Sequence, residues 1–485
     1  MSIFDLVQGD DEPVFTNRHV RIETDVRGKS FAYGGLALAH ELVGRLELDR
    51  LINERVKVLR RHRPYLEGDH LLTHAYNLFV GGDAIEDIAT LQNSEAFRNL
   101  VGAATVPDPS TAGDFLRRFK VEDLGCFQGA IDEARQKVWR KLPRSVRACL
   151  TIDMDSTLKT VYGECKEGAD FTYKGTWGYH PLLISTHETK ECLRIINRPG
   201  NSTSAAGAAL ALDECLGMAA NSFKHLRLRG DSAFYEEAII LTAEAHEAEF
   251  AIVMDSCAAA RKLAEALPER AWKLWDPAKP ISSPKRKVAK RPRRKRERLR
   301  RQKALERNYR TLTTLRQWVS EIRYKPSFAK KSYRVVVKRQ LIQETGGQLD
   351  LIQRYEYRFI ITNNETDDAG AMVRFAYGRC DQENTIEQLK NGIAAMRMPT
   401  GGLLANGAFM LAAELAWNLR AWLSLVALPK ETLSWEWKRF RLAFVYLSAK
   451  VGRTAGSVVA RIATSHRHLP DIIAASKLLR NLAFA

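Results

Sequence analysis

The sequence predicts a mixed α/β core, a mixed sheet flanked by helices, that is interrupted by an insertion and lies between helical N- and C-terminal regions. Three observations predict this fold class. Apolar residues follow helical spacing over residues 33–140, and they change to a two-residue alternation near residue 148. The succession of strand and helix patterns stops after Ser256 and resumes near residue 351. A chain of 485 residues with 45% hydrophobic content can bury the cores of two to four domains.

These changes of pattern divide the chain into four expected regions. They are 1–145, mainly helical; 146–256 together with 351–425, the α/β core; 257–350, the insertion; and 426–485, helical and basic. In the first region Pro107 and Pro109 break the chain, and Ser110 or Thr111 is expected to cap the next helix.

The core region is expected to combine strands with helices. The strands are 148–156, 178–187, 191–200, 225–232, 249–255 and 355–363, and the helices are 204–220 and 235–247. The first strand places Asp153 and Asp155 on one face and its apolar residues on the other, whereas Asp231 ends a later strand. A helix that begins near Asp368 follows the last strand. The apolar stretch 407–426 is expected to be a buried helix, because Glu414 and Arg420 interrupt it.

Basic residues outnumber acidic ones, 75 to 57, which gives a formal net charge of +18 and suggests an anionic partner such as nucleic acid. Residues 285–303 hold 13 basic residues and one acidic residue, and they account for most of the excess. A solvated linker and a phosphate-contacting segment both fit this run, and counterion release favours phosphate contact. The expected nucleic-acid-binding residues are Lys285, Arg286, Lys287, Arg291, Arg293, Arg294, Lys295 and Arg296.

Several classes of protein are disfavoured by what the sequence lacks. The seven cysteines are scattered, without Cys-x-x-Cys pairs or histidines at zinc-ligand spacing, and are expected to be reduced thiols. No window approaches the roughly 18 uncharged apolar residues of a membrane span, and the first residues lack the pattern of a signal peptide. We therefore expect a cytoplasmic protein without membrane association. No Gly-rich phosphate loop is present, so no bound nucleotide is expected.

Three carboxylates lie where the expected elements bring strand ends together. Asp155 or Asp153 is on the first strand, Asp231 ends a later strand, and Glu383 is on the helix after the last strand. In an open α/β sheet, such positions converge on one crevice. Carboxylate oxygens suit Mg²⁺, and two ions about 3.5 to 4 Å apart assist phosphodiester displacement. Taken singly, each aspartate could instead be a turn former or a helix cap.

The stretch 377–390, YGRCDQENTIEQLK, carries an acid between two bases. At about 100° per residue, Arg379, Glu383 and Lys390 share one face of a helix, and Leu389 lies on the flank of that face. The alternative is an ordinary solvated face, but Arg before Glu is the less favourable order for an i, i+4 pair. A mixed-charge line at the edge of the core therefore favours a functional site.

These residues resemble those of the DDE transposases of bacterial insertion sequences. In one group of these enzymes the third acid lies in a signature of Tyr, two residues, Arg, three residues, Glu, six residues, Lys, which Arg379, Glu383 and Lys390 match. Ala376 occupies the Tyr position, and Tyr377 follows it. The blocks DMDST, KGTWGYHPLL, RPGNSTSAAGA, LRGDSAFY and ENTIEQLKNG resemble those of the group-one DDE transposase family, thirteen-eighty insertion-sequence type, and occur in order.

The resemblance implies a ribonuclease-H-like catalytic core that an insertion domain interrupts between the second aspartate and the glutamate. By position, Asp155, Asp231 and Glu383 are the expected catalytic and metal-binding residues, and they would hold Mg²⁺ or Mn²⁺, as two ions. Asp153 is the rival for the first position. Asp155 is favoured because the family's aspartate precedes a small residue and then Thr or Ser, as Asp155 does.

The implied function is that of a transposase, which cleaves the ends of an insertion sequence and transfers the freed 3′-OH ends into target DNA. Arg379 and Lys390 would contact DNA phosphates, and the N-terminal region would bind the element ends, mediate dimerisation, or do both. The expected partners are the terminal inverted repeats and the target DNA. A homodimer is expected because two ends must be cut together.

Three other interpretations compete with this one. A ribonuclease-H-like nuclease would cut DNA without joining it, and a non-catalytic DNA-binding descendant of a transposase would rely on the basic run. The tripeptide Arg229-Gly230-Asp231 matches a cell-adhesion motif, but the chain lacks the expected export signal and disulfide framework. The intact carboxylates favour an enzyme over a non-catalytic descendant.

Overall fold

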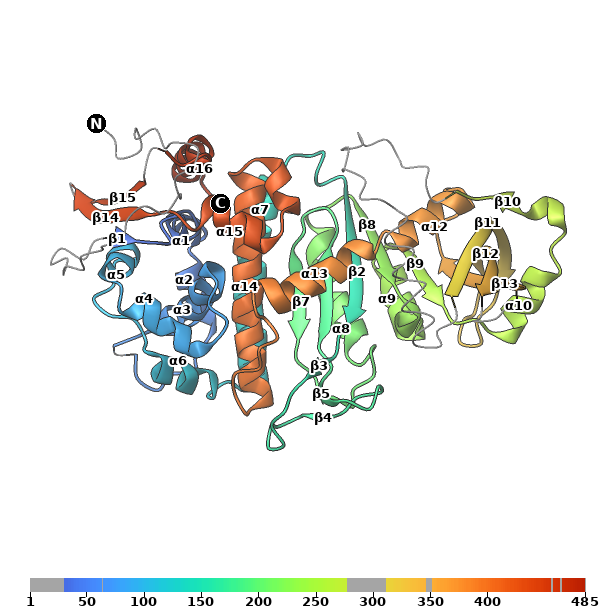
Figure 1. The fold of residues 1–485 in the computed structure, drawn as a ribbon, viewed down its shortest axis with the longest axis horizontal. Helices are drawn as coiled ribbons and strands as arrows, with labels where there is room; N and C mark the ends of the chain where they lie inside the picture. Colours follow the sequence, from blue (N-terminus) through green and yellow to red (C-terminus); the bar gives the residue numbers. More distant parts are fainter. Residues whose placement is uncertain are drawn as a thin grey trace, which may run out of the picture.

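The computed structural model describes residues 30–62, 64–276, 311–345, 351–454, 457–462 and 465–484. In Figure 1 the chain forms an elongated molecule, with the N-terminal helices and the C-terminal segments at one end. A large mixed sheet flanked by helices occupies the middle, and its longest strands lie toward the other end. The predicted α/β class, with a mixed sheet flanked by helices, is therefore confirmed.

Helices dominate the first part of the described chain. They are α1 (Leu36–Leu46), α2 (Leu48–Arg55), α3 (Glu67–Val80), α4 (Ile88–Gln92), α5 (Glu95–Val101), α6 (Pro109–Leu116) and α7 (Val121–Lys141). Helix α6 begins with Pro109, and the Asp108 carboxylate accepts a hydrogen bond from the Thr111 backbone N–H (2.9 Å). The cap predicted at Ser110 or Thr111 is therefore wrong, because the aspartate before the proline supplies the acceptor.

One large mixed sheet of the described residues has the strand order β10-β11-β12-β13-β9-β8-β2-β6-β7. Its strands are β2 (Cys149–Ser156), β6 (Leu182–Thr186), β7 (Cys192–Ile196), β8 (His225–Gly230), β9 (Glu249–Met254), β10 (Lys273–Leu274), β11 (Thr311–Tyr324), β12 (Tyr333–Thr345) and β13 (Leu351–Thr362). Strand β8 is parallel to β2 and to β9, and the other neighbouring pairs are antiparallel. The parallel register pairs Asp153 with Arg229, so the carboxyl ends of β2 and β8 meet at one edge.

Shorter elements complete the middle of the molecule. Helices α8 (Ala208–Ala220) and α9 (Glu237–Ala245) pack on the sheet through a core that includes Leu212, Ile240 and Phe250. Strands β3 (Lys159–Thr160), β4 (Asp170–Phe171) and β5 (Trp177–Tyr179) form a small separate sheet. The small sheet follows β2 in the chain and α9 follows β8, whereas α8 lies between β7 and β8.

Strands from the predicted insertion extend the central sheet. After helix α10 (Ala258–Glu265), β11 pairs with β12, β12 with β13, and β13 with β9, all antiparallel. The chain therefore returns to the core along a continuous ladder. The basic run at 285–303, with every residue predicted from it to bind nucleic acid, lies outside the described residues. The division of the chain into domains stays a prediction.

Helix α14 (Leu403–Val426) corresponds to the apolar helix predicted at 407–426, and it contacts α3, α7 and β7. Every residue from Ala405 to Ser424 is buried, which explains why its apolar residues surround the helix on all sides. Within the described ranges, no helix has both the length and the apolar character needed to cross a bilayer.

The C-terminal segment, predicted to be helical, also contains a strand pair. Helices α15 (Trp437–Phe444) and α16 (Leu469–Asn481) flank β14 (Ala449–Thr454) and β15 (Ser457–Ile462), and β1 (Ser30–Phe31) pairs with β14. The two ends of the described chain thus meet in one small sheet (Figure 1). The helical prediction is wrong for these strands, where β-branched residues such as Val458 and Val459 favour extended backbone.

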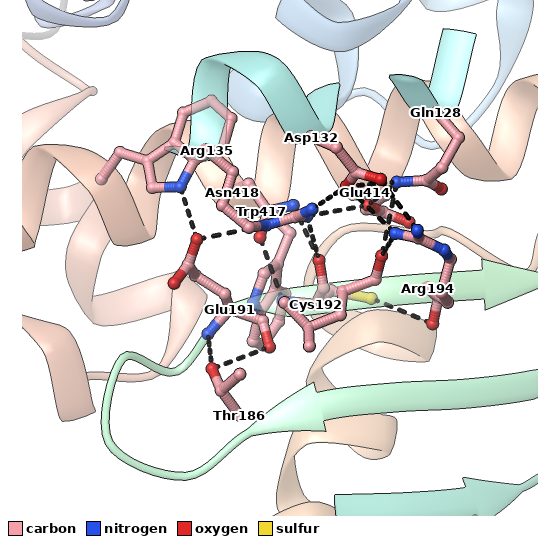
Figure 2. A network of polar contacts seen from close by, with 12 residues as sticks. Gln128, Asp132, Arg135, Thr186, Glu191, Cys192, Arg194, Glu414, Trp417 and Asn418 are labelled. Atoms are coloured by element: carbon pink, nitrogen blue, oxygen red, sulfur yellow. Dashed lines mark hydrogen bonds and ion pairs between the residues drawn. The ribbon is translucent and has the colours of Figure 1, made fainter. Parts of the chain in front are cut away.

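A buried set of charged residues, the interior network, joins α7, β7 and α14 (Figure 2). Its members are Asp132, Arg135, Glu191, Arg194 and Glu414. The Arg135 guanidinium is fully buried, 3.3 Å from Glu191 and 3.1 Å from Glu414. On α14, the Asn418 side chain accepts a hydrogen bond from the Cys192 N–H (3.0 Å) and donates one to the Cys192 carbonyl (2.8 Å). Both backbone groups of Cys192, on the edge strand β7, therefore have hydrogen-bond partners. The network fixes the helical layer against one edge of the sheet.

Candidate active site

Two aspartates lie where β2 and β8 end. Asp155 is the penultimate residue of β2, and Asp231 directly follows β8. Extending the parallel register by two residues places them opposite each other. Both face the same cation, because Arg379 Nη2 lies 3.2 Å from Asp155 Oδ2 and 3.8 Å from Asp231 Oδ2. The structure therefore brings these two predicted site residues together.

The electrostatics of Asp155 indicate an excess of negative charge. Burial raises the pKa of Asp155 from 3.8 to about 6. The Arg379 charge opposes that shift, whereas the charges of Asp231 and Glu383 add to it. Burial is the largest cause and the neighbouring acids add to it, so the ionised form of Asp155 is destabilised in the folded protein. The site therefore favours a further cation when its acids are ionised.

Glu383, the third predicted acid, lies on α13 (Cys380–Glu387). Its side chain is exposed, and it has no ion-pair partner in the part of the chain that the structure describes. Its charge acts on Asp155, which places it near the two aspartates. Among the described residues, no three His, Cys, Asp or Glu side chains are close enough to hold a metal ion. Two acids thus face one guanidinium, and the third acts on Asp155 through its charge alone. Asp155, Asp231 and Glu383 are called the carboxylate edge below.

Asp153, the predicted rival of Asp155, has a different environment. Its two oxygens accept hydrogen bonds from Arg229, at 2.6 Å from Nε and 2.7 Å from Nη2, and both side chains are 3% exposed. Arg229 also donates to the Phe375 carbonyl (3.2 Å). A Cβ at Gly378 would lie 2.4 Å from the Arg229 guanidinium, so a glycine is required there. Asp153 therefore forms a buried ion pair with Arg229. Because Arg229 is buried, the Arg-Gly-Asp tripeptide that it begins is not displayed on the surface.

The helical stretch that carries the third acid is not one regular helix. Helix α12 (Ala369–Tyr377) ends before Gly378, and α13 is followed by a π-helical turn over Gln388–Gly392. The single α-helical register predicted for 377–390 is therefore wrong. Extra residues in a turn re-aim the side chains that follow, and such π-turns are frequent at functional sites.

Lys390 lies in this π-helical turn and reaches the loop after Asp155. Its Nζ donates hydrogen bonds to Thr157 Oγ1 (2.5 Å) and to the Leu158 carbonyl (3.2 Å). Burial lowers the pKa of Lys390, as does the charge of Lys159, whereas the Asp155 charge raises it. Lys390 therefore ties the segment that carries the third acid to the strand end that carries the first.

Sequence reasoning missed a second contact that holds the end of β2. His180 Nε2 lies 3.0 Å from Ser156 Oγ, and its Nδ1 lies 2.8 Å from the Ser202 carbonyl. Because a carbonyl can only accept, Nδ1 carries the proton and Nε2 accepts the Ser156 hydroxyl. Burial also lowers the pKa of His180, which favours the neutral ring. The sequence feature that could have indicated this contact is the histidine within GYHP, which was predicted only as part of a strand.

Comparison with known proteins gives a family for the whole of this arrangement. A family model described as transposase DDE domain group 1 matches residues 13–483. Among solved structures, the chain is similar to the cryo-EM structure of the piggyBac transposase synaptic complex with hairpin DNA. The two are 11% identical, with a TM-score of 0.33, and the match covers 86% of this chain and 83% of that chain. No curated protein matches the sequence significantly.

Proposed function

Because this chain belongs to the transposase DDE domain group 1 family, we propose that it is the DNA transposase of a bacterial insertion sequence. It cleaves DNA at the ends of the element and transfers the freed 3′-OH ends into target DNA. The observation that carries the proposal is the carboxylate edge: two acids from adjacent parallel strands face one guanidinium, and the charge of a third acts on the first.

The topology supports the ribonuclease-H-like core that the family resemblance implies. Strands β7, β6, β2, β8 and β9 are neighbours in that order, with β8 parallel to β2 and β9 and with β6 antiparallel to β2 and β7. The first two acids come from β2 and β8, at the centre of this set. The interruption between Asp231 and Glu383 contains the long strands β11 and β12.

The donor set suits a hard divalent cation. The three side chains offer only carboxylate oxygens, which Mg²⁺ and Mn²⁺ prefer, and the raised pKa of Asp155 reports charge that Arg379 alone does not compensate. Asp155 and Asp231 would hold the metal where they now face Arg379, and Glu383 would join them from α13. When bound, as a pair of ions, the metal would activate the attacking oxygen and stabilise the leaving oxygen.

The chain's own groups would orient the DNA and the acids. Arg379, with two carboxylates within 4 Å, can turn its guanidinium to a DNA phosphate once another cation replaces it at the aspartates. Lys390 and His180 keep the end of β2 in place through Thr157 and Ser156. Water attack at the element end breaks one phosphodiester bond and frees the 3′-OH. Attack of that 3′-OH on target DNA then exchanges one phosphodiester bond for another.

The proposed partners are the terminal inverted repeats and the target DNA, bound by two copies of the chain so that both ends are cut together. The basic run at 285–303 supports DNA binding through its charge. A DNA sequence that shows inverted repeats and a short target duplication around the coding frame would identify the substrate for the assays below.

The direct test incubates purified protein and Mg²⁺ with DNA that carries the element ends and with a circular target. We expect cleaved ends and joined products, and Glu383→Gln should lower both by about a thousandfold or more. Glu387→Gln, an exposed acid one turn further along α13, is the matched control and should leave both unchanged. Cleavage without any joined product would identify a nuclease. DNA binding without cleavage, indifferent to Glu383→Gln, would identify a non-catalytic descendant.

A further inference from the structure

A lysine amine lies between two aromatic rings where the insertion strands meet α12. Lys338 Nζ is 4.8 Å from the ring centroid of Trp275 and 4.5 Å from that of Tyr377. The residue is only 8% exposed, and within the described ranges no carboxylate forms an ion pair with it. Its position is therefore fixed by ring faces, which attract a cation without neutralising it.

Arg339, the next residue of β12, provides a contrast, because its charge is paired within the protein. Arg339 points to the opposite face of β12, where Trp272 lies 4.3 Å from its guanidinium. Its two terminal nitrogens donate to both oxygens of Glu269, at 2.7 and 2.8 Å. Arg339 thus has an internal carboxylate. Lys338 has the aromatic support but no carboxylate partner among the described residues.

The end of α12 links the lysine to the carboxylate edge, while β13 and β9 lie between its strand and β8. Tyr377 is the last residue of α12, two positions before Arg379, which faces Asp155 and Asp231. Helix α12 contacts β9, β11 and β12, and in Figure 1 α12 and α13 follow one another between the insertion strands and α14. A DNA strand held at the carboxylate edge and continuing along α12 would pass the Lys338 amine.

A second cation shares this face of the sheet. Arg358 on β13 is directly opposite Lys338 in the antiparallel register, so both side chains are on one face. Its side chain is 58% exposed, and its nearest acid in the described residues is Glu356, at 3.9 Å. Burial, and to a smaller extent the Arg358 charge, lower the pKa of Lys338 to about 8. An anion placed between the two residues would relieve that repulsion.

We propose that Lys338 and Arg358 bind a backbone phosphate of the DNA strand that leaves the carboxylate edge. This inference rests on the proposed function. The ligand class is a nucleic-acid phosphate diester, bound without regard to base sequence. Lys338 is the preorganised contact, because Trp275 and Tyr377 restrict its side chain before DNA arrives. Arg358, exposed and less restricted, adds charge from the adjacent strand.

The test compares binding of end DNA by the full chain without divalent metal, so that no cleavage occurs. Lys338→Met keeps an unbranched side chain between the rings and removes only the charge. We expect about tenfold weaker binding and a slope of log K against log salt that is smaller by about 1. Lys338→Arg should restore most of both. The control is Lys331→Met, since Lys331 is 62% exposed and pairs with Glu244 just before the same strand; it should change neither.

A second measurement identifies the phosphate and separates contact from a change of shape. End DNAs with a neutral methylphosphonate at single positions near the cleavage site are bound by the wild type and by Lys338→Met. At one position the methylphosphonate should abolish the difference between the two proteins. An unchanged salt slope in Lys338→Met, or a difference that persists at every position, would overturn the proposal while wild-type cleavage and joining stay intact. Failure of the wild type to bind or cleave end DNA would instead remove the proposed function itself.

Discussion

The interior network and the carboxylate edge both combine acids with arginines, and they differ in how completely the acids are enclosed. In the interior network two arginines pair with three acids, and indole and amide groups donate hydrogen bonds to Glu191 and to one oxygen of Glu414. At the carboxylate edge one arginine faces two acids, and the third is exposed. The first arrangement joins helices to a sheet, and the second leaves negative charge at the surface for a ligand.

A raised pKa occurs in both clusters and does not distinguish them. Burial raises the pKa of Glu414 in the interior network to about 7 and that of Asp155 to about 6, and arginine charges oppose both shifts. Glu414 is sealed between α14 and the sheet, whereas the side chain of Asp231, beside Asp155, is 42% exposed. Access to solvent is what distinguishes the carboxylate edge from the interior network and favours it as the proposed binding site.

The largest contrast is expected from the same substitution at an arginine of each cluster. Arg135→Met leaves buried acids of the interior network without their cation, and we expect it to lower the free energy of unfolding by about 3 to 5 kcal/mol. Arg379→Met should cost less stability, about 1 kcal/mol, because Asp231 reaches water and Asp155 can bind a proton, while cleavage falls. Urea denaturation of both variants measures the contrast. Equal losses of stability would contradict the distinction between the clusters.

Two aspartates on one strand provide a finer comparison. Asp153→Asn breaks a buried two-bond ion pair with Arg229, and we expect a loss of about 3 kcal/mol in the free energy of unfolding. Thermal denaturation at neutral pH, read with the urea midpoint, measures it. A stable Asp153→Asn variant that has lost cleavage would instead give Asp153 the catalytic place.

Asp155→Asn should act in the opposite direction. The folded-state pKa of Asp155 is raised above its unfolded value, so the native state binds more protons between about pH 4 and 6, and stability falls as pH rises through that window. Removing the charge should therefore stabilise the metal-free protein by about 1 to 3 kcal/mol at pH 7. The wild type and the variant should converge below pH 4. A variant less stable than the wild type at pH 7 would mean that Arg379 already neutralises this acid.

The smallest effect is expected at the contact that holds the end of β2. Ser156→Ala removes the hydroxyl that donates a hydrogen bond to His180 Nε2. We expect about tenfold slower cleavage with unchanged DNA affinity. Thr160→Ala, at an exposed position on β3, is the control and should be neutral. A loss of DNA affinity with an unchanged cleavage rate would assign Ser156 to DNA binding instead.

The sequence was informative where periodicity and chemistry agreed. The alternation around Asp155 and the strand end at Asp231 predicted strands whose ends meet, and the spacing from Arg379 to Lys390 predicted a helix that carries Glu383. The roles of these acids stay predictions. The mixed sheet itself is confirmed, because long runs of alternating apolar residues leave little choice of element.

What the sequence could not predict depends on contacts between distant residues or on local exceptions to regular geometry. The Asp153–Arg229 pair joins positions 76 residues apart and requires the parallel register of β2 and β8. The close approach of the Arg229 guanidinium to Gly378, which leaves no room for a Cβ, likewise depends on tertiary packing. The π-turn around Lys390 adds residues to a turn without any change of composition.

The central claim is that the carboxylate edge binds metal. Its most direct test measures, by electron paramagnetic resonance, Mn²⁺ binding to the purified protein in complex with end DNA that lacks a cleavable bond. We expect bound Mn²⁺ in the wild type, and an affinity at least about tenfold lower in Asp155→Asn and in Glu383→Gln. Glu387→Gln, on the same helix as Glu383, should bind as the wild type does. Equal Mn²⁺ affinity in all four proteins would contradict the assignment of the carboxylate edge as the metal site.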